Sequence, residues 1–387
     1  MKNNKIILQP KYLEGFQCDG SKCNAKCCRT NWRIDIGMKS YKKYQRIKNP
    51  AMRKKILSSV EPDTAGRGFQ IKLGENLRCP LLCEDKLCYI QRNLGEEALS
   101  FICRYYPRDV HNIGSFQIRV LSMSCPVAAE SALFSPDGMN LQKIECKGDE
   151  LAGIWSLPLG IKNVPDDLAA VHTMLGGFAI LQNKAYNMEQ RLALLGLFMD
   201  RVQDCQQDAE AVLELISHYN SEKFRQEISS LWESWQFYPA AHRQFMSGVF
   251  KLLNEYKEIS SVAISLFMSK SNEQFPDDKN SVLPKGLDEV LERYWQQEWL
   301  FNAFPFAVEG SFWHNYFAYL IAYEILQAYI YGKYESAKVW DKETVLKELG
   351  IFSRLIDHER NFKDILVKET AVFESEPLKL MQVLLRV

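Results

Sequence analysis

The sequence predicts an α+β fold that is mainly α, with a small cysteine-rich module of short strands followed by a larger all-helical domain. Two observations lead to this prediction. Nine of the 11 cysteines lie within residues 18–125 of the 387-residue chain. From about Pro165 onward, apolar residues recur every three to four positions and β-branched alternation is scarce, which is typical of packed helices. We therefore expect two domains, residues 1–150 and 151–387, with the boundary between Asp137 and Pro165.

The N-terminal half is expected to contain short elements separated by turns. Residues 1–37 look irregular, and Pro50 and Pro107 each interrupt a helical pattern. We expect four short helices, at Lys39–Ile47, Ala51–Val60, Gly95–Tyr105 and Cys125–Phe134. Two segments with alternating apolar residues suit short strands of one small sheet, Phe69–Leu73 and Phe116–Leu121.

The C-terminal part is predicted to be helical. Apolar residues have helical spacing in seven segments, Asp166–Gln182, Met188–Gln206, Ala209–Ser217, Ala240–Glu258, Leu287–Phe301, Phe312–Tyr331 and Lys342–Asp357. The most apolar stretch, Tyr316–Tyr331, contains Glu324 and is shorter than the roughly 20 apolar residues of a membrane span. We interpret it as a buried core helix and expect no membrane partner. The pair Gly176-Gly177 lacks the preceding strand of a dinucleotide-binding motif, so we interpret it as a helix-packing site.

The charge distribution and the N-terminal sequence argue against a nucleic-acid-binding protein and against a secreted one. The formal net charge is zero, but residues 1–60 carry a net charge of +12 and the remainder −12. Basic and aromatic residues interleave at Tyr41–Tyr44, yet the pI of about 7.0 is below the value of about 9 typical of nucleic-acid-binding domains, so we expect no nucleic-acid partner. The apolar stretch Ile6–Leu8 is shorter than the core of a secretory signal. We therefore expect a cytoplasmic protein, in which clustered cysteines are metal ligands or catalytic groups.

The cysteines have the spacing of metal ligands. They form the groups Cys18-x4-Cys23-x3-Cys27-Cys28 and Cys79-x3-Cys83-x4-Cys88, followed by the single residues Cys103 and Cys125. Because no histidine lies in the first group, we expect an all-thiolate site, which suits either zinc or a [4Fe–4S] cluster. Eight or nine thiolates exceed the needs of one four-ligand centre, so either there are two centres or some cysteines lie outside the ligand set. Cys146 and Cys205 are expected to be bystanders.

In order along the chain, these motifs resemble the flagellin lysine-N-methyltransferase family, whose N-terminal part belongs to a wider class of cysteine-rich, zinc- or iron-chelating domains. The matching segments are LQPKY at Leu8–Tyr12, Cys18–Cys28 followed by Trp32, CPLL at Cys79–Leu82, LCYIQ at Leu87–Gln91, LGEEALS at Leu94–Ser100, C-x-x-YPR at Cys103–Arg108 and LSMSCP-x-AA at Leu121–Ala129. Tyr294–Phe306 (YWQQEWLFNAFPF) resembles the family's aromatic segment that ends in FPF. The resemblance spans most of the chain.

The resemblance implies a metal-binding set of eight cysteines, Cys18, Cys23, Cys27, Cys28, Cys79, Cys88, Cys103 and Cys125. Cys83 stands where relatives usually have a polar residue, so we do not expect it to be an essential ligand. A second departure is SCPVAAE at Ser124–Glu130, where relatives more often read SCPEAAR. Residues 1–150 are accordingly expected to form a metal- or cluster-binding domain, and residues 151–387 a helical domain.

The resemblance also implies an enzyme that transfers methyl groups from S-adenosylmethionine (SAM) to surface lysines of flagellin. Two mechanisms stay open. In one, a deprotonated lysine amine attacks the SAM methyl directly and the metal is structural. In the other, a [4Fe–4S] cluster near the SAM site binds or reduces SAM and takes electrons from a donor protein. The alternative function is a zinc-stabilised flagellin-binding module or chaperone without catalysis.

The segment CRYYPR is predicted to form the rim of the active site. Tyr105 and Tyr106 are the predicted catalytic residues, because aromatic rings can stack on adenine or face the sulfonium cation. Their hydroxyl groups, together with Asp109 or His111, could help to deprotonate the substrate lysine, whose ordinary pKa is about 10.4. Arg104 and Arg108 are predicted to bind the SAM carboxylate.

Overall fold

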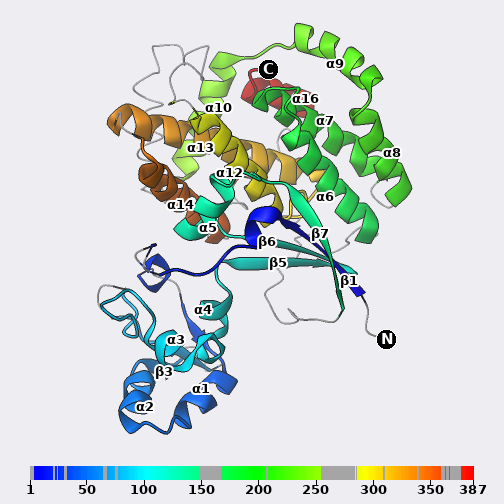
Figure 1. The fold of residues 1–387 in the computed structure, drawn as a ribbon. Coiled ribbons are helices and arrows are strands. Elements are labelled where there is room, and N and C mark those ends of the chain that lie inside the picture. Colours follow the sequence, from blue (N-terminus) through cyan, green and yellow to red (C-terminus); the bar gives the residue numbers. More distant parts are fainter. Residues whose placement is uncertain are drawn as a thin grey trace.

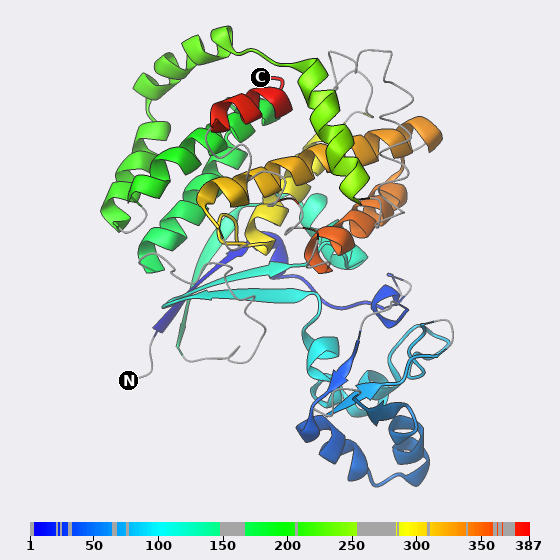
Figure 2. The ribbon, with the colours of Figure 1, turned by 180° about the vertical axis from the view of Figure 1, so that it is seen from behind.

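The structure is a computed structural model that describes residues 4–20, 22–23, 25–29, 33–63, 68–74, 77–147, 167–205, 208–253, 284, 286–307, 310–337, 340–358, 362, 366 and 376–387. Figures 1 and 2 show two parts. We call the smaller part, residues 18–105, the cysteine lobe, and the larger remainder the body. The mixture of small sheets with a majority of helices confirms the predicted fold class, and every element described after residue 150 is a helix.

The cysteine lobe consists of short helices and a three-stranded antiparallel sheet. Its strands, in the order β2-β4-β3, are β2 (Asp35–Ile36), β4 (Phe69–Ile71) and β3 (Val60–Pro62). Its helices are α1 (Met38–Gln45), α2 (Pro50–Leu57), α3 (Tyr89–Leu94) and α4 (Phe101–Tyr105), with the 3-10 helices η2 (Lys26–Cys28) and η3 (Glu96–Ala98). Asn49 starts α2, because its side chain accepts a hydrogen bond from the Met52 N–H at 3.1 Å and Pro50 fits the first turn.

The body contains a four-stranded sheet in the order β5-β6-β1-β7. Its strands are β1 (Asn4–Pro10), β5 (Arg108–Ile113), β6 (Phe116–Leu121) and β7 (Leu141–Lys147). β1 pairs parallel with β6 and antiparallel with β7, so the first strand of the chain lies inside the sheet. The expectation that residues 1–37 are irregular was therefore wrong for β1.

The expectation that Phe69–Leu73 and Phe116–Leu121 share one sheet was also wrong. β4 pairs with β2 and β3 in the cysteine lobe, whereas β6 pairs with β5 and β1 in the body. Both β4 and β6 thus have a hydrogen-bonded neighbour on each edge, and these neighbours come from the same part of the molecule. The two sheets belong to separate hydrophobic cores. Which sheet a strand joins depends on its long-range pairing and not on its own sequence pattern.

Helices cover the sheet and form most of the body. They are η1 (Lys11–Leu13), α5 (Pro126–Leu133), α6 (Asp167–Gln182), α7 (Met188–Cys205), α8 (Ala209–Tyr219), α9 (Glu222–Ser234), α10 (Pro239–Leu252), α12 (Leu287–Phe301), α13 (Phe312–Ala337), α14 (Lys342–His358) and α16 (Pro377–Leu384). All seven predicted helices are confirmed, although the predicted end of one, at Glu258, lies outside the described residues. α9 and α16 were missed. The prediction of a buried core helix is confirmed by α13, and no described helix is both long and apolar enough to cross a bilayer.

The two adjacent glycines of α6 allow other side chains to approach its backbone closely. A Cβ atom at Gly177 would lie 2.3 Å from Cζ2 of Trp299, and one at Gly176 would lie 2.8 Å from Cγ1 of Ile216. Real side chains do not approach so closely, so any larger residue would displace these neighbours. This confirms that Gly176-Gly177 is a helix-packing site.

Buried polar contacts hold the sheet against the helices of the body. The Tyr12 hydroxyl donates to Oε1 of Gln297 at 2.6 Å, and Nε2 of Gln297 donates to the Leu121 carbonyl at 2.7 Å. β5 is joined to the end of α12 by His111, whose Nε2 lies 2.9 Å from the Phe301 carbonyl oxygen. Apolar side chains of the sheet and α5 belong to the same hydrophobic core as the helices. The division at residue 150 stays a prediction, since residues 148–166 lie outside the described part.

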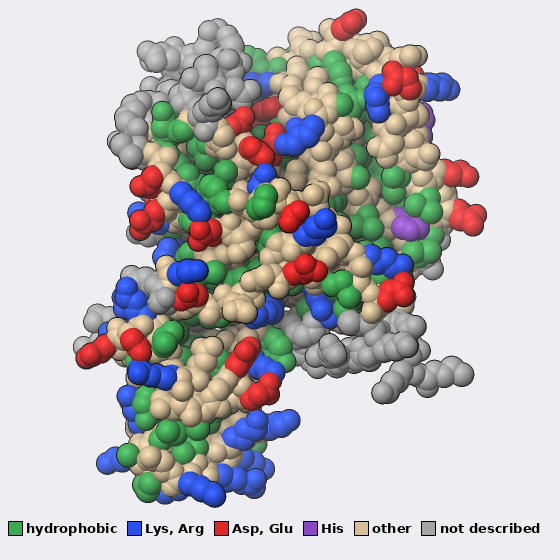
Figure 3. Space-filling model, in the orientation of Figure 1, with side chains coloured by type: hydrophobic (Ala, Val, Ile, Leu, Met, Phe, Trp, Pro, Cys, Tyr) green, Lys and Arg blue, Asp and Glu red, His purple; other side chains and the backbone are tan. Residues whose placement is uncertain are grey.

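Basic side chains gather on the outer end of the cysteine lobe. From Met38 to Leu57, α1, α2 and their connection contain eight basic and no acidic residues, Lys39, Lys42, Lys43, Arg46, Lys48, Arg53, Lys54 and Lys55. Figure 3 shows Lys and Arg side chains concentrated at this end, whereas basic and acidic side chains are mixed over the visible face of the body. Most of the positive charge of the first 60 residues is therefore a surface feature of these two helices.

Candidate functional site: a cavity lined by eight cysteines

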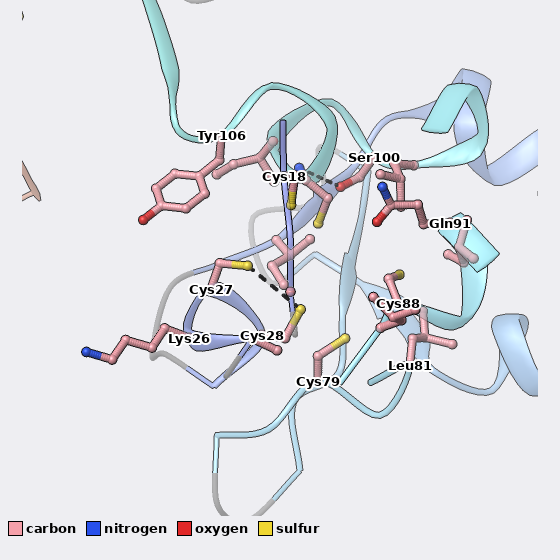
Figure 4. Close-up of a pocket in the computed structure, with 18 of the residues that line it drawn as sticks. Cys18, Lys26, Cys27, Cys28, Cys79, Leu81, Cys88, Gln91, Ser100 and Tyr106 are labelled. Atoms are coloured by element: carbon pink, nitrogen blue, oxygen red, sulfur yellow. Dashed lines mark hydrogen bonds between the residues drawn. The ribbon is translucent and has the colours of Figure 1, made fainter. Parts of the chain in front are cut away.

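A cavity of about 310 Å³ lies where the cysteine lobe meets the body. Its wall includes all eight cysteines of the predicted set, Cys18, Cys23, Cys27, Cys28, Cys79, Cys88, Cys103 and Cys125. Figure 4 shows the sulfur atoms of several of these side chains around a common space. Cys83 is described but does not line the cavity. Segments that are far apart in the sequence thus bring one set of thiols together.

Backbone hydrogen bonds connect the first two cysteine groups. The Ala25 N–H donates to the Gly20 carbonyl at 2.9 Å, and the Cys28 N–H donates to the Ala25 carbonyl at 2.9 Å, which closes a tight turn into η2. The Cys28 carbonyl then accepts the Cys79 N–H at 2.9 Å. This last bond places the second group directly beside the first.

Two of the lining cysteines precede helices. Cys88 comes directly before α3, and Cys125 comes directly before α5, whose first residue is Pro126. Cys83 lies in the turn that leads to Cys88, where its N–H donates to the Leu87 carbonyl at 2.9 Å. The same turn therefore directs Cys88 into the cavity wall and leaves Cys83 outside it.

Six of the lining thiols are in surroundings that favour the neutral form, namely Cys18, Cys27, Cys79, Cys88, Cys103 and Cys125. Burial raises the pKa of Cys79 to about 11 and that of Cys125 to about 12, although backbone N–H groups at the start of α5 partly oppose the shift at Cys125. The pKa of Cys27 is raised by its hydrogen bond with Cys28, whose sulfur lies 4.0 Å away, and by burial. Binding of a metal would have to displace these protons, so it would release them to solvent.

The donor set fits a thiolate-bound metal or cluster in its chemistry. Eight cysteines and no histidine line the cavity, and thiolates are the ligand type of zinc and of iron–sulfur clusters. Within the described ranges, no group of three or more Cys, His, Asp or Glu side chains already stands in a metal-binding arrangement. The fold therefore gathers the eight thiols in one place without selecting four of them.

Apolar side chains form much of the remaining wall. The cysteine lobe contributes Ile34, Ile36, Tyr44, Ile71, Leu81, Ile90, Leu99 and Ile102. Most of these also belong to the hydrophobic core of the lobe. Because the same residues pack the lobe and line the cavity, the shape of the cavity depends on how the lobe is folded.

Of the four residues predicted for catalysis and SAM binding, only Tyr106 lines the cavity. Tyr105 packs against Phe101, with the ring centroids 4.7 Å apart. Arg104 forms a two-pronged ion pair with Glu97, in which one contact measures 2.7 Å. Arg108 lies over the ring of Phe16, 5.0 Å from its centroid. The roles assigned to these four residues stay predictions.

The two other predicted helpers also lie away from the cavity wall. Oδ1 of Asp109 accepts a hydrogen bond from the Val110 N–H at 2.7 Å, and His111 is fully buried beside α12. Neither residue lines the cavity. Their observed contacts lie within β5 and between β5 and α12.

Two polar residues near the cavity, Ser124 and Lys26, were not predicted from the sequence. The Tyr106 hydroxyl lies 3.0 Å from Oγ of Ser124, which belongs to the LSMSCP motif and could have been found there. Lys26 also lines the cavity, and burial together with Arg354 and Lys347 of α14 lowers its pKa. Figure 4 shows the Lys26 side chain directed away from the sulfur atoms. Lys26 carried no signal in the sequence because its cationic neighbours lie more than 300 residues away.

Comparisons with known proteins found similarity to parts of this chain. Residues 177–381, more than half of the chain, match the family model described as the FliB lysine N-methylase C-terminal domain. A lysine-N-methylase of Salmonella choleraesuis is 33% identical over 141 residues, which are 35% of this chain and 35% of that protein. A lysine-N-methylase of Salmonella typhimurium matches to the same extent. The flagellar biosynthetic protein FliU of Salmonella muenchen is 33% identical over 139 residues, which cover 81% of its length.

The matches cover only part of this chain and part of its relatives. The chain spans about a third of the length of the two lysine-N-methylases that it matches. No solved structure matches it. The family model begins after the eight cysteines, so it does not cover the cavity. Through residues 177–381, the chain belongs to the FliB lysine N-methylase family.

Proposed function

We propose that this protein is a cytoplasmic methyltransferase that transfers methyl groups from SAM to surface lysines of flagellin. We further propose that its cysteine cavity holds a [4Fe–4S] cluster near the SAM site. The observation that carries the proposal is the position of the cavity. Eight thiols lie where the cysteine lobe meets a body that belongs to a lysine N-methylase family.

The names of the relatives support the reaction and the substrate. Two of them are called lysine-N-methylase, and a third is called a flagellar biosynthetic protein. Lysine as acceptor and flagellin as substrate protein agree with both names. SAM is proposed as the methyl donor because of the sequence resemblance.

The thiols that line the cavity would hold the cluster, and when bound it would supply electrons or a Lewis acid to SAM. The residues of the chain itself would prepare the lysine. A lysine ammonium must lose a proton before its nitrogen can accept a methyl group, and its ordinary pKa of about 10.4 opposes this at neutral pH. Apolar wall residues such as Ile34 and Leu99 would lower that pKa by desolvation. Tyr106 lines the same wall.

The first experiment tests the reaction. Protein purified without oxygen is incubated with flagellin, SAM and a chemical reductant, and flagellin peptides are then analysed by mass spectrometry. We expect lysine-containing peptides that are heavier by one or more methylene groups. If no peptide gains mass while the protein retains its metal, the methyltransferase proposal is wrong.

A matched pair of variants tests the cavity. Cys88 lines it and Cys83, five residues earlier, does not. We expect Cys88→Ser to lose most of the bound iron and methyl transfer, and Cys83→Ser to retain both. Equal losses in the two variants would contradict the assignment of the cavity as the cluster site.

The metal itself decides between the proposal and its alternative. An iron–sulfur protein is coloured and contains iron and sulfide, whereas a zinc protein is colourless. Stoichiometric zinc without iron, combined with flagellin binding but no methyl transfer, would identify a zinc-stabilised flagellin-binding module instead. A redox-active cluster would in addition require an electron-donor protein as a partner.

A further inference from the structure

Two helices at the outer end of the cysteine lobe, α1 and α2, present an exposed basic surface. Three of the eight basic residues of this segment hold it in place, and Lys55 is one of them, because its Nζ lies 4.1 Å from the centroid of the Tyr89 ring. The other five side chains are exposed and have no ion pair within the part of the chain that the structure describes. We call these five the basic surface, and they are Lys39, Lys42, Arg46, Lys48 and Lys54.

The basic surface and the cavity lie on opposite sides of α1. Tyr44 is only 1% exposed and lines the cavity. With 3.6 residues per turn, residues two positions apart on a helix point in nearly opposite directions. Lys42 and Arg46, two positions before and after Tyr44, therefore point to solvent. Figures 1 and 2 place α1 and α2 at the end of the lobe that is farthest from the body.

Only a thin layer of protein separates this surface from the thiols. Burial raises the pKa of the Tyr44 phenol, and Cys103 and Cys88 add to that shift, so the ring lies near both sulfur atoms. The Tyr44 hydroxyl donates to the Ala98 carbonyl at 2.8 Å, which holds the ring in the wall. A helix with its side chains is about 10–12 Å across. A side chain of a docked protein is too large to pass through this packed layer, but an electron can cross it.

The charge distribution favours a small acidic partner over an extended one. Outside residues 1–60, the chain carries a net charge of −12. Duplex nucleic acid has one negative charge per about 1.7 Å of its axis, so it would extend past the lobe and be repelled by the acidic remainder. An anionic membrane surface is extended in the same way. A small protein with an acidic patch can be confined to the outer end of the lobe, where Figure 3 shows Lys and Arg side chains.

We propose that the basic surface docks a small acidic electron-carrier protein, which delivers electrons to the cluster in the cavity. This inference rests on the proposed [4Fe–4S] cluster. In each encounter one electron leaves the carrier, which is oxidised, and enters the cluster, which is reduced, and no bond forms or breaks. Interfaces between electron-transfer proteins are commonly small, and charge complementarity mainly raises their rate of association. Two helices of eight residues each suit an encounter of this kind.

The test measures how fast an acidic carrier reduces the protein. The probe is a plant-type [2Fe–2S] ferredoxin, which is reduced, freed of excess reductant and mixed without oxygen with the iron-loaded, full-length protein in a stopped-flow spectrometer. We expect rapid oxidation of the ferredoxin that slows as salt is added. Reversal of two charges in Lys42→Glu/Arg46→Glu is expected to slow it about tenfold to a hundredfold at low salt. A wild-type rate in this variant would overturn the proposal.

Two lysines of the body provide a matched control. Lys223 on α9 and Lys251 on α10 are both exposed, and Lys223→Glu/Lys251→Glu changes the net charge by the same amount. We expect this variant to keep the wild-type rate, and an equal slowing in both double variants would overturn the proposal. Lys42→Gln/Arg46→Gln adds no acidic group to the lobe and should show a smaller slowing. Iron content and reduction by a small chemical reductant should be unchanged in every variant, which shows that the lobe is folded.

Binding measurements separate this inference from the proposed function. Oxidised ferredoxin is titrated into the protein in a calorimeter, and the iron content of the same sample is determined. A protein without iron contradicts the proposed cluster, whether or not ferredoxin binds. An iron-loaded protein that ferredoxin neither binds nor reduces contradicts only the docking surface. Binding of a short DNA duplex or of phosphatidylserine vesicles in place of ferredoxin, weakened by Lys42→Glu/Arg46→Glu, would also overturn the proposal and identify a different partner.

Discussion

The cysteine lobe and the body are stabilised in different ways. The longest helices of the lobe have eight residues, and its core consists of Ile34, Ile36, Tyr44, Ile56, Ile71, Cys79, Leu81, Ile90 and Leu99. The body contains a helix of 26 residues and a far larger core. Small cores commonly need a metal or disulfides, and the described cysteines form no disulfide. We infer that the lobe depends on what its cavity binds, whereas the body depends on its own packing.

If the cavity holds the metal or cluster that we propose, its removal should affect the two parts most differently. Metal binding contributes about 10–16 kcal/mol to the folding of small zinc-bound domains, so a chelator is expected to unfold the lobe. The body should stay folded, because most helices belong to it. Limited proteolysis followed by mass spectrometry would show cuts within residues 18–105 first. If the lobe resists proteolysis equally before and after chelation, its stability does not depend on a bound metal.

A substitution in the core of the body should destabilise the body and leave the cysteine lobe unaffected. Trp299 is fully buried, its Nε1 donates to the Met174 carbonyl at 2.9 Å, and its ring packs on Tyr319 with centroids 5.2 Å apart. Trp299→Ala is expected to lower the free energy of unfolding by about 3–5 kcal/mol, as measured by urea denaturation. Metal content per folded molecule should not change. Loss of metal in proportion to stability would show that the two parts unfold together.

A cap in the lobe should have a smaller, local effect. Asn49→Ala removes the hydrogen bond to the Met52 N–H and is expected to destabilise α2 by about 1 kcal/mol. In the metal-free protein, hydrogen exchange in α2 should become faster, while that in α13 stays the same. Asn220→Ala, a substitution at an exposed helix end of the body, serves as the control. Faster exchange in both α2 and α13 would mean that the lobe is not an independent unit.

The smallest expected effect concerns the acid sensitivity of the body. Burial opposes ionisation of Glu292, but hydrogen bonds from Lys184 and Arg191 outweigh it and lower its pKa. A carboxyl whose pKa is lowered by folding stabilises the protein above its unfolded pKa and loses that contribution as the pH falls. Glu292→Gln should therefore cost about 1 kcal/mol near pH 7 and less near pH 3. Urea unfolding at both pH values measures this, and a constant difference would contradict it.

Local sequence patterns predicted much of this structure. The helices from α6 to α14 are marked by apolar spacing within single segments, so all but α9 were found. The eight cysteines were found because their motifs resemble a family, and the structure places all eight around one cavity. Their division into ligands could not be predicted, since it depends on how several loops meet in space.

Long-range contacts account for what was missed. β1 has only three consecutive strongly apolar residues, Ile6 to Leu8, and becomes a strand because β6 and β7 pair with it. Asp357 lies in an ordinary helical pattern, and only the folded chain brings it to Ser122. Tyr105, Arg104 and Arg108 were chosen because they neighbour Cys103, but they do not line the cavity, because neighbours along a helix or strand point in different directions. Their predicted roles stay predictions.

The central position of β1 has a consequence for how the protein is made. β1 leaves the ribosome before its partners, because β6 begins roughly 110 residues later and β7 later still. At about 5–20 residues per second, translation leaves β1 unpaired for several seconds. The whole cysteine lobe emerges during that interval, between β1 and the strands that will fix it in place. Its thiols are thus accessible from solvent before β6 and β7 complete the sheet and the body closes over the cavity.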